Sequence, residues 1–365
     1  MKKIVILAAG IETALGNLEA TWEGLLSGQT GLSHPFIPGF EHRFPLGLIE
    51  KLPFPLGSSE RLVALLDQCL DKISELPGKT ALICATTKGA IDEILLPDRD
   101  QDDAHPLHIS TYLAGKLPWI DHFSITSAAC ASGTIAIIQA GMRIRCGDFD
   151  NVIVIGIDLI STFVLAGFAS LQALAPEACR PFDRNRNGLS LGEGAGWMIL
   201  TGSENVLGTA CQPQACLQSW GIACDASHIT APCRKASGLI AALKQTLKNQ
   251  TGLIGAINAH GTGTRYNDAM ELLAYDQIAP AKTPLHSIKG ALGHCLGATG
   301  VIEAALAVRS LMQGAIPPTS GLQNPEETQM AVSGTAVLPL RSPSVLSCNA
   351  GFGGINSCIL MTGYI

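Results

Sequence analysis

Segments expected to be strands and segments expected to be helices alternate along this chain in two successive runs. The first run places its apolar and amphipathic segments at residues 4–8, 18–26, 81–86, 110–117, 123–126, 134–146, 152–157 and 197–200. The second run covers residues 215–224, 236–248, 253–258, 268–277, 286–288 and 301–313, and ends in an expected hairpin through 345–346 and 358–361. Such alternation predicts an α/β fold in which helices cover mixed or parallel sheets.

The composition is typical of a large globular protein. Of 365 residues, 47% are hydrophobic and 15% charged, so the chain can bury a large core. No stretch approaches the roughly 20 apolar residues of a membrane helix, and the net charge of −6 argues against nucleic acid binding. The twelve cysteines form no Cys-x-x-Cys pair or zinc-type cluster, which predicts free thiols in a reducing cytoplasm and no metal site.

The heptad Ser127-Ala-Ala-Cys-Ala-Ser-Gly133 places one cysteine where a strand ends and a helix begins. The unpaired N–H groups and positive dipole end of a helix favour a thiolate, so we expect the pKa of Cys130 to lie below the about 8.5 of an unperturbed thiol. Cys130 is therefore a candidate nucleophile. Cysteine is also a common small buried hydrophobe, and this heptad alone fits structural packing equally well.

Two distant segments each place a histidine in a glycine-rich turn after an expected strand. They are Asn258-Ala-His-Gly-Thr-Gly-Thr264 and the segment 287–303, which contains Lys-Gly-Ala-Leu-Gly-His-Cys. A single histidine in such a turn would more commonly be a hydrogen-bonded loop residue. Because the arrangement occurs twice, alongside a strand-end cysteine, the pattern favours a catalytic site of Cys130, His260 and His294.

This combination resembles the decarboxylating β-ketoacyl synthases of the KAS I/II type, the condensing enzymes of fatty-acid and polyketide synthesis in the thiolase superfamily. Similar segments extend along nearly the whole chain, at residues 15–17, 21–28, 180–188, 192–196 and 349–356. The resemblance implies a thiolase-like, five-layered αβαβα fold made of two pseudo-symmetric βαβαβ halves. Residues 1–203 would form the half with the nucleophilic cysteine, and residues 204–365 the half with both histidines.

The resemblance also implies a mechanism. Cys130 takes an acyl group from a pantetheine thioester and later releases it to a carbon nucleophile, and sulfur suits both steps. His260 and His294 contact the malonyl thioester carbonyl, where the enolate charge of decarboxylation develops, while the backbone N–H groups of Cys130 and Phe352 form the oxyanion hole. No cofactor of the protein's own is implied, since an acyl carrier protein supplies the phosphopantetheine arm.

Four further positions receive roles from the resemblance. Lys289 and Glu303 would be ion-paired behind the histidines, where Lys289 holds His294 in a productive state; the alternative is a solvated helix pair. Thr262 and Thr264 would hydrogen-bond the pantetheine arm, or would satisfy the backbone of their own turn.

Phe352, between glycines, is similar to the aromatic gate that admits the malonyl group. Ala350 stands where the family usually has a second phenylalanine. Ile109 aligns loosely with the residue that limits the acyl pocket at the dimer interface. Three family-matched polar residues are expected to be structural: Asp183, Glu193 and Asp268.

Other departures concern the partners. The chain is shorter than usual between residues 40 and 108, where interface segments normally lie. Where the family presents several cations to the acidic carrier protein, residues 58–61 offer only Arg61, and Gln172 replaces an arginine found in some members. Either another basic patch serves, or a partner subunit carries the docking surface.

Three functions remain open. The chain could be an active elongating synthase, in a homodimer or heterodimer, or a non-condensing, chain-length-factor-like partner of a second synthase, as in aromatic polyketide and aryl polyene pathways. The presence of Cys130, His260 and His294 favours activity. A thiolase or priming synthase would need a second catalytic cysteine or a Cys-His-Asn triad; Cys295 follows His294, but within a synthase motif.

Overall fold

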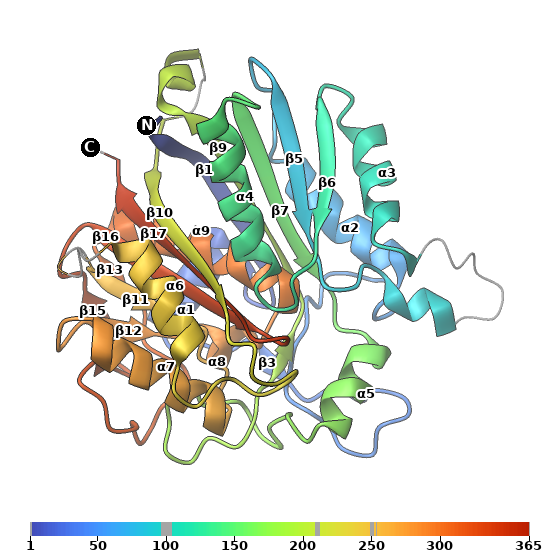
Figure 1. Ribbon diagram of the computed structural model, residues 1–365. Coiled ribbons are helices and arrows are strands. Elements are labelled where there is room, and N and C mark those ends of the chain that lie inside the picture. Colours follow the sequence, from blue (N-terminus) through green and yellow to red (C-terminus); the bar gives the residue numbers. More distant parts are fainter. Residues whose placement is uncertain (1, 96–103, 209–211, 249–251, 253, 365) are drawn as a thin grey trace.

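The structure, a computed structural model, describes residues 2–95, 104–208, 212–248, 252 and 254–364 (Figure 1). Within these residues, one large sheet has the strand order β14 (Ala331–Val332), β12 (Pro284–His286), β11 (Ala256–Asn258), β16 (Ser344–Gly351), β17 (Ile355–Gly363), β10 (Ala215–Cys224), β1 (Ile4–Thr13), β9 (Gly194–Gly202), β7 (Asn151–Asp158), β5 (Thr80–Ala85) and β6 (His122–Thr126). A short strand, β2 (Gly16–Asn17), pairs with β1 outside this order.

The same strand order and directions occur twice in this sheet. β1 pairs antiparallel with β9, β9 antiparallel with β7, and β7, β5 and β6 continue in parallel. β10, β17, β16, β11 and β12 repeat this pattern, and antiparallel pairing of β1 with β10 joins the two sets. The change from one set to the other falls between Gly202 and Ala215, next to the division predicted near residue 203, which stays a prediction.

Two helices, α4 (Ser132–Cys146) and α9 (Thr299–Gln313), lie between the two strand sets. α9 contacts β9 on one side and β16 on the other, and α4 packs against β7 and α9. The outer faces are covered by α2 (Ser59–Leu70) and α3 (Leu107–Lys116) on the first set, and by α6 (Ser237–Leu247) and α7 (Arg265–Ile278) on the second. The five-layered order implied by the resemblance is therefore present, with an apolar core at each boundary.

Close contact between the starts of α4 and α9 joins the cysteine segment to the second histidine segment. A Cβ on Gly300 would lie 2.3 Å from the backbone nitrogen of Thr134, and a Cβ on Gly133 would lie 2.8 Å from that of Val301. Any larger residue at either position would push the two helices apart. This approach holds the Cys130 turn beside the loop that carries His294.

Several predicted elements are present, with changes at their ends. α1 (Leu18–Leu26) and β10 have the predicted bounds. The strand expected at 286–288 ends at His286, because the next residues turn into α8 (Lys289–Leu292). The strand expected at 253–258 begins at Ala256, and residue 253 lies outside the described residues.

Helix α5 (Thr162–Ser170) was not expected from the sequence, and α2 lies where only the family resemblance implied a helix, near Arg61. α2 buries an apolar stripe at helical spacing, with Leu62, Leu65 and Leu66 inside, whereas α5 buries only Leu165 and leaves Phe163 exposed. In each, the side chain of the preceding serine accepts a hydrogen bond from a first-turn N–H group, which starts the helix.

Arg61 is a buried structural residue. Its Nε donates to Glu193 Oε2 at 3.1 Å, and its Nη2 and Nη1 donate to the backbone carbonyls of Ile49 and Leu52 at 2.9 and 2.6 Å. Only 3% of the residue is exposed. The expectation that Arg61 offers a surface cation to a carrier protein is therefore wrong, because Glu193 neutralises its charge inside the protein.

Short strands form two further small sheets, one from β3 (Leu32–Ser33), β4 (Leu46–Gly47) and β8 (Leu191–Gly192), the other from β13 (Ala315–Ile316) and β15 (Leu338–Pro339). None of the helices in the described part of the chain has the length and apolar character needed to cross a membrane.

Candidate active site

A cavity of about 510 Å³ brings the three predicted catalytic side chains together. Cys130 reaches it from the turn before α4, His260 from the loop after β11, and His294 from the loop after α8. These loops follow strands that end at the same edge of the sheet, where βα turns carry functional residues in open α/β folds. Ile109 lies elsewhere, on the buried face of α3, and its role at an acyl pocket stays a prediction.

A sharp turn presents Cys130 to this cavity. The preceding residue, Ala129, has a φ of 48°, in the left-handed region that few residues other than glycine adopt. Ser132 stabilises the turn, because its Oγ accepts a hydrogen bond from the backbone nitrogen of Ala128 at 2.8 Å. Strained backbone of this kind persists only where the surrounding structure enforces it.

The Cys130 thiol is held in its neutral form. Burial raises its pKa to about 12, although Lys289 and the backbone N–H groups of Phe352 and of Cys130 itself act in the opposite direction. The expectation of a lowered pKa is therefore wrong for this site. The removal of the thiol from water raises its pKa more than the N–H groups at the start of α4 lower it. The two N–H groups are those predicted to form the oxyanion hole.

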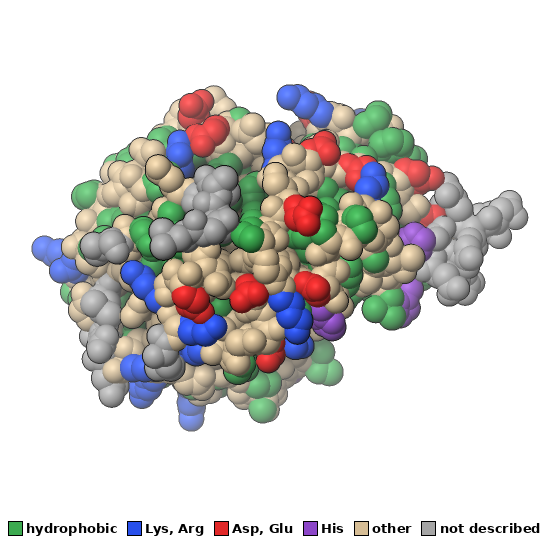
Figure 2. Space-filling model, turned by 90° about the horizontal axis from the view of Figure 1, so that it is seen from above, with side chains coloured by type: hydrophobic (Ala, Val, Ile, Leu, Met, Phe, Trp, Pro, Cys, Tyr) green, Lys and Arg blue, Asp and Glu red, His purple; other side chains and the backbone are tan. Residues whose placement is uncertain are grey.

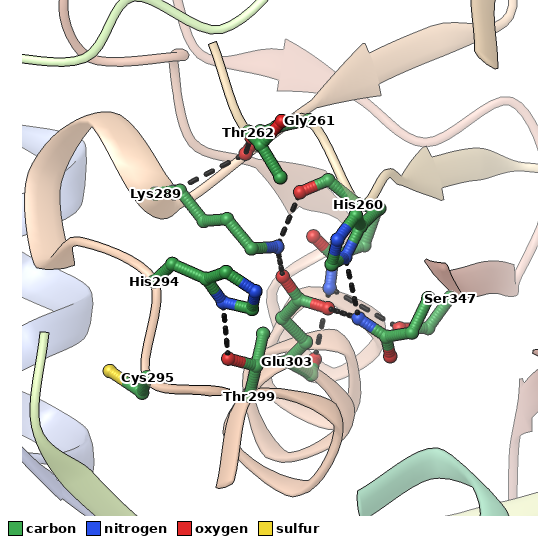
Figure 3. Close-up of polar contacts among 12 residues, drawn as sticks. His260, Gly261, Thr262, Lys289, His294, Cys295, Thr299, Glu303 and Ser347 are labelled. Atoms are coloured by element: carbon green, nitrogen blue, oxygen red, sulfur yellow. Dashed lines mark hydrogen bonds and ion pairs between the residues drawn. The ribbon is translucent and has the colours of Figure 1, made fainter. Parts of the chain in front are cut away.

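His260 and His294 lie edge to face, with ring centroids 5.1 Å apart (Figure 3). Burial and the positive charge of Lys289 lower the pKa of both well below the usual range, so both rings are neutral. His294 Nδ1 lies 3.0 Å from Thr299 Oγ1, and its buried Nε2 has no hydrogen-bond partner among the described residues. An unpaired polar atom in a cavity is available to a substrate.

Lys289 and Glu303 form a buried ion pair behind the histidines. Lys289 Nζ lies 2.6 Å from Glu303 Oε1 and also donates to the backbone carbonyl of His260 (Figure 3). Both side chains are at most 1% exposed, which excludes the solvated helix pair. Burial raises the pKa of Glu303, and Lys289 opposes that shift. Lys289 contacts the His260 segment directly, whereas its effect on His294 is electrostatic.

Asn349 joins this network, although sequence analysis gave it no role. Its Nδ2 donates to Glu303 Oε2 at 2.7 Å and lies 3.3 Å from His260 Nδ1, while its Oδ1 accepts from Thr134 Oγ1. Because an amide nitrogen can only donate, His260 Nδ1 must accept, and the ring hydrogen lies on Nε2. β16 is buried continuously from Ser344 to Asn349, and an asparagine in a fully buried strand could have been recognised as a polar residue that needs partners.

Thr262 and Thr264 line the cavity and contact each other. Their hydroxyl oxygens are 2.9 Å apart, and the Thr264 backbone nitrogen lies 3.4 Å from Thr262 Oγ1. The turn is also held by Asp268, whose carboxylate accepts from the backbone nitrogens of Thr262 and Gly263. The two hydroxyls thus serve their own turn and still face the space a substrate arm would fill.

Phe352 stands at the cavity on the turn between β16 and β17. Its ring is stacked on Phe168 of α5, with centroids 5.6 Å apart, and 38% of the residue is exposed. Phe168 therefore gives Phe352 an aromatic contact, although the second phenylalanine usual in the family is replaced here by Ala350. Movement of Phe352 as a gate stays a prediction.

Comparisons with known proteins agree with this fold and identify its family. Family models described as the β-ketoacyl synthase N-terminal and C-terminal domains match residues 123–205 and 214–323. The mitochondrial 3-oxoacyl-(acyl-carrier-protein) synthase of Arabidopsis thaliana is 30% identical over 85% of this chain and 70% of its own length. The 3-oxoacyl-(acyl-carrier-protein) synthase 2 of Vibrio cholerae is 28% identical over 98% of each chain.

Among solved structures, a ketosynthase in complex with its chain length factor from Xenorhabdus doucetiae is similar, with a TM-score of 0.83 and 29% identity over 100% of this chain and 98% of that one. Fold and site together define a condensing enzyme of the thiolase superfamily. Within that class, the chain belongs to the β-ketoacyl synthase family, as its resemblance predicted.

The raised pKa of Cys130 predicts its reactivity toward iodoacetamide. Alkylation should keep accelerating through about pH 8.5, where an unperturbed thiol titrates, because the thiolate of Cys130 remains a minor species. Cys233 is an internal control, since a hydrogen bond from Ser237 lowers its pKa and its alkylation should level off at lower pH. Peptide mass spectrometry would measure both rates, and a Cys130 rate that levels off first would contradict the raised pKa.

Asn349→Ser should impair the step that uses His260 as a donor. The variant loses the contact that fixes the ring hydrogen on Nε2, and outer partners that orient metal-binding histidines are worth about 10–100-fold. We expect a loss of that order in malonyl decarboxylation, with a smaller change in Cys130 acylation. Nitrogen NMR should show the Nε2-protonated tautomer in the wild type and a mixture in the variant. Thr134→Val, which keeps the Asn349–His260 contact, is the matched control; equal losses in both variants would refute the tautomer role.

Proposed function

We propose that this protein is a β-ketoacyl-(acyl carrier protein) synthase that condenses an acyl group held on Cys130 with malonyl carrier protein in fatty-acid or polyketide synthesis. The observation that carries the proposal is that one buried thiol and two neutral histidines face a single cavity. The names of the relatives from Vibrio cholerae and Arabidopsis thaliana support the reaction class and the carrier-bound substrates.

Acyl transfer begins with the neutral thiol. Cys130 attacks the thioester carbonyl of the acyl donor, and its proton must leave as the carbon–sulfur bond forms. His294 suits the acceptor role, because the Thr299 hydroxyl can accept the hydrogen on Nδ1 and leave Nε2 free. The oxyanion lies at the N–H groups of Cys130 and Phe352. Its collapse expels the carrier thiolate, which takes the proton back from His294 Nε2 and leaves as a thiol.

Condensation uses the histidines as donors. Loss of carbon dioxide from the malonyl thioester leaves an electron pair on carbon and negative charge on the thioester oxygen, where Nε2–H groups can stabilise it. His260 is set for this by Asn349, and neutral His294 is a donor in the tautomer whose Nδ1 accepts from the Thr299 hydroxyl and whose Nε2 carries the hydrogen. The carbanion attacks the acyl carbonyl on Cys130. Expulsion of the cysteine thiolate gives the 3-oxoacyl product, and a proton from solvent restores the thiol.

A dimer is part of this proposal. In the described part of the chain, β6 pairs only with β5, so its other edge is open to a strand of a second subunit. Similar solved structures are ketosynthases paired with chain length factors, including that of the ishigamide system at 25% identity. These structures support a second candidate function for this chain, that of a non-condensing partner subunit. The complete set of Cys130, His260 and His294 supports an active synthase. The proposed compartment is the cytoplasm.

The two half-reactions should separate under mutation. Cys130→Ala should abolish acyl transfer from acyl carrier protein with the fold retained, because alanine fits the same turn. His260→Ala should still accept the acyl group on Cys130 but lose condensation by about 10²–10³-fold, the cost of one preorganised donor. Intact-mass spectrometry would follow the adduct, and product analysis the condensation.

Wild-type condensation by His260→Ala would contradict the proposal. An acyl adduct that persists in Cys130→Ala, or that maps to the neighbouring Cys295, would remove the nucleophile assignment. Cys295→Ala is the matched control, since that thiol is buried and lies outside the cavity lining.

A further inference from the structure

Two arginines at the mouth of the catalytic cavity pair with no acidic side chain in the described part of the chain. Arg265, the first residue of α7, lines the cavity and is exposed. Arg234, in the loop before α6, places its guanidinium 5.0 Å from the ring centroid of Tyr266, which also lines the cavity. Among the described residues, neither arginine side chain forms an ion pair or hydrogen bond. We call Arg234, Arg265 and Tyr266 the mouth rim.

Three other arginines, Arg180, Arg186 and Arg61, are already engaged. Arg180 pairs with Glu177 at 3.1 Å, and Arg186 donates to Glu326 at 2.5 Å and to backbone carbonyls around α7. Arg61 is buried against Glu193. On the face seen in Figure 2, blue and red side chains are interspersed, so that face offers no single basic patch. The mouth rim is therefore where unpaired positive charge meets the catalytic cavity.

The chemistry of the rim fits a phosphate at the end of a long arm. A guanidinium binds phosphate oxygens through two parallel hydrogen bonds. The N-terminal N–H groups of the 14-residue α7 lie at the same place, and the side chain of its N-cap residue Thr264 makes no capping bond to them. An arm with its thioester at Cys130, in the interior, would extend past Thr262 and Thr264 toward Arg265.

The second half of the rim fits a protein surface. Tyr266 is 60% exposed, and Ile229, another residue of the cavity lining, is 77% exposed. Exposed aromatic and arginine side chains beside an apolar residue are enriched at binding interfaces. Arg234, stacked on Tyr266, adds a charge that complements an acidic partner.

We propose that the mouth rim is the docking site of the carrier protein, in which Arg265 binds the phosphate of the phosphopantetheine arm and Arg234, on Tyr266, pairs with an acidic side chain of the carrier. This inference rests on the proposed function, because it assumes a carrier-bound substrate. It moves docking away from the region of Arg61, which is buried.

Three acyl donors of increasing size separate the two contacts. They are acyl-pantetheine, acyl-phosphopantetheine and acyl carrier protein, each with the same acyl group. Arg265→Glu should remove the preference for acyl-phosphopantetheine over acyl-pantetheine, measured as the ratio of their kcat/KM values for Cys130 acylation. Arg234→Glu should keep that ratio and lower kcat/KM for acyl carrier protein about tenfold relative to acyl-phosphopantetheine, as expected when an interfacial charge pair is reversed.

Matched variants complete the test. Arg265→Lys should restore part of the phosphate preference, and Lys244→Glu, an exposed charge reversal near the far end of α6, should leave every ratio at its wild-type value. The rim proposal is overturned if both rim variants keep the wild-type ratios. A wild type that accepts acyl groups from none of the three donors would instead refute the proposed function.

Discussion

The buried ion pair of Lys289 and Glu303 fixes the geometry of the site. Charges taken out of water cost several kcal/mol each unless they are paired and fully hydrogen-bonded. Here the Lys289 ammonium also meets the His260 carbonyl, and the second oxygen of Glu303 meets Asn349. The pair therefore ties together the starts of α8 and α9, the loop after β11 and the end of β16. None of these four segments can shift without removing an ion-pair or hydrogen-bond partner from a buried charge.

The same ion pair sets the protonation of the site. The positive charge of Lys289 and burial keep both histidines neutral, while burial keeps Cys130 a thiol. A site at rest thus holds no charged nucleophile and no imidazolium. Charge develops only when a substrate carbonyl or a malonyl carboxylate arrives, at positions where N–H groups are already aimed. The N–H groups therefore stabilise the charge of the transition states, while the empty site carries no such charge.

Local sequence patterns predicted the three side chains that meet in the catalytic cavity. Cys130 stands at a strand end and His260 and His294 in glycine-rich turns after expected strands, and such turns converge at one sheet edge, which is why three distant segments could be grouped. What the sequence could not indicate depends on side-chain direction. Arg61 points inward to Glu193, and Asn349 reaches His260 across the sheet. The raised pKa of Cys130 likewise depends on burial by segments far along the chain. The contact of Arg234 with Tyr266 also joins residues that are distant in the sequence.

The most direct test of this account is malonyl decarboxylation by Cys130→Gln. An uncharged amide imitates the acylated cysteine and cannot act as a nucleophile, so the variant isolates the work of the histidines and of the ion pair behind them. Carbon dioxide release from malonyl carrier protein should persist in Cys130→Gln and disappear when His260→Ala is added. A Cys130→Gln variant that folds, binds malonyl carrier protein and releases no carbon dioxide would contradict the account.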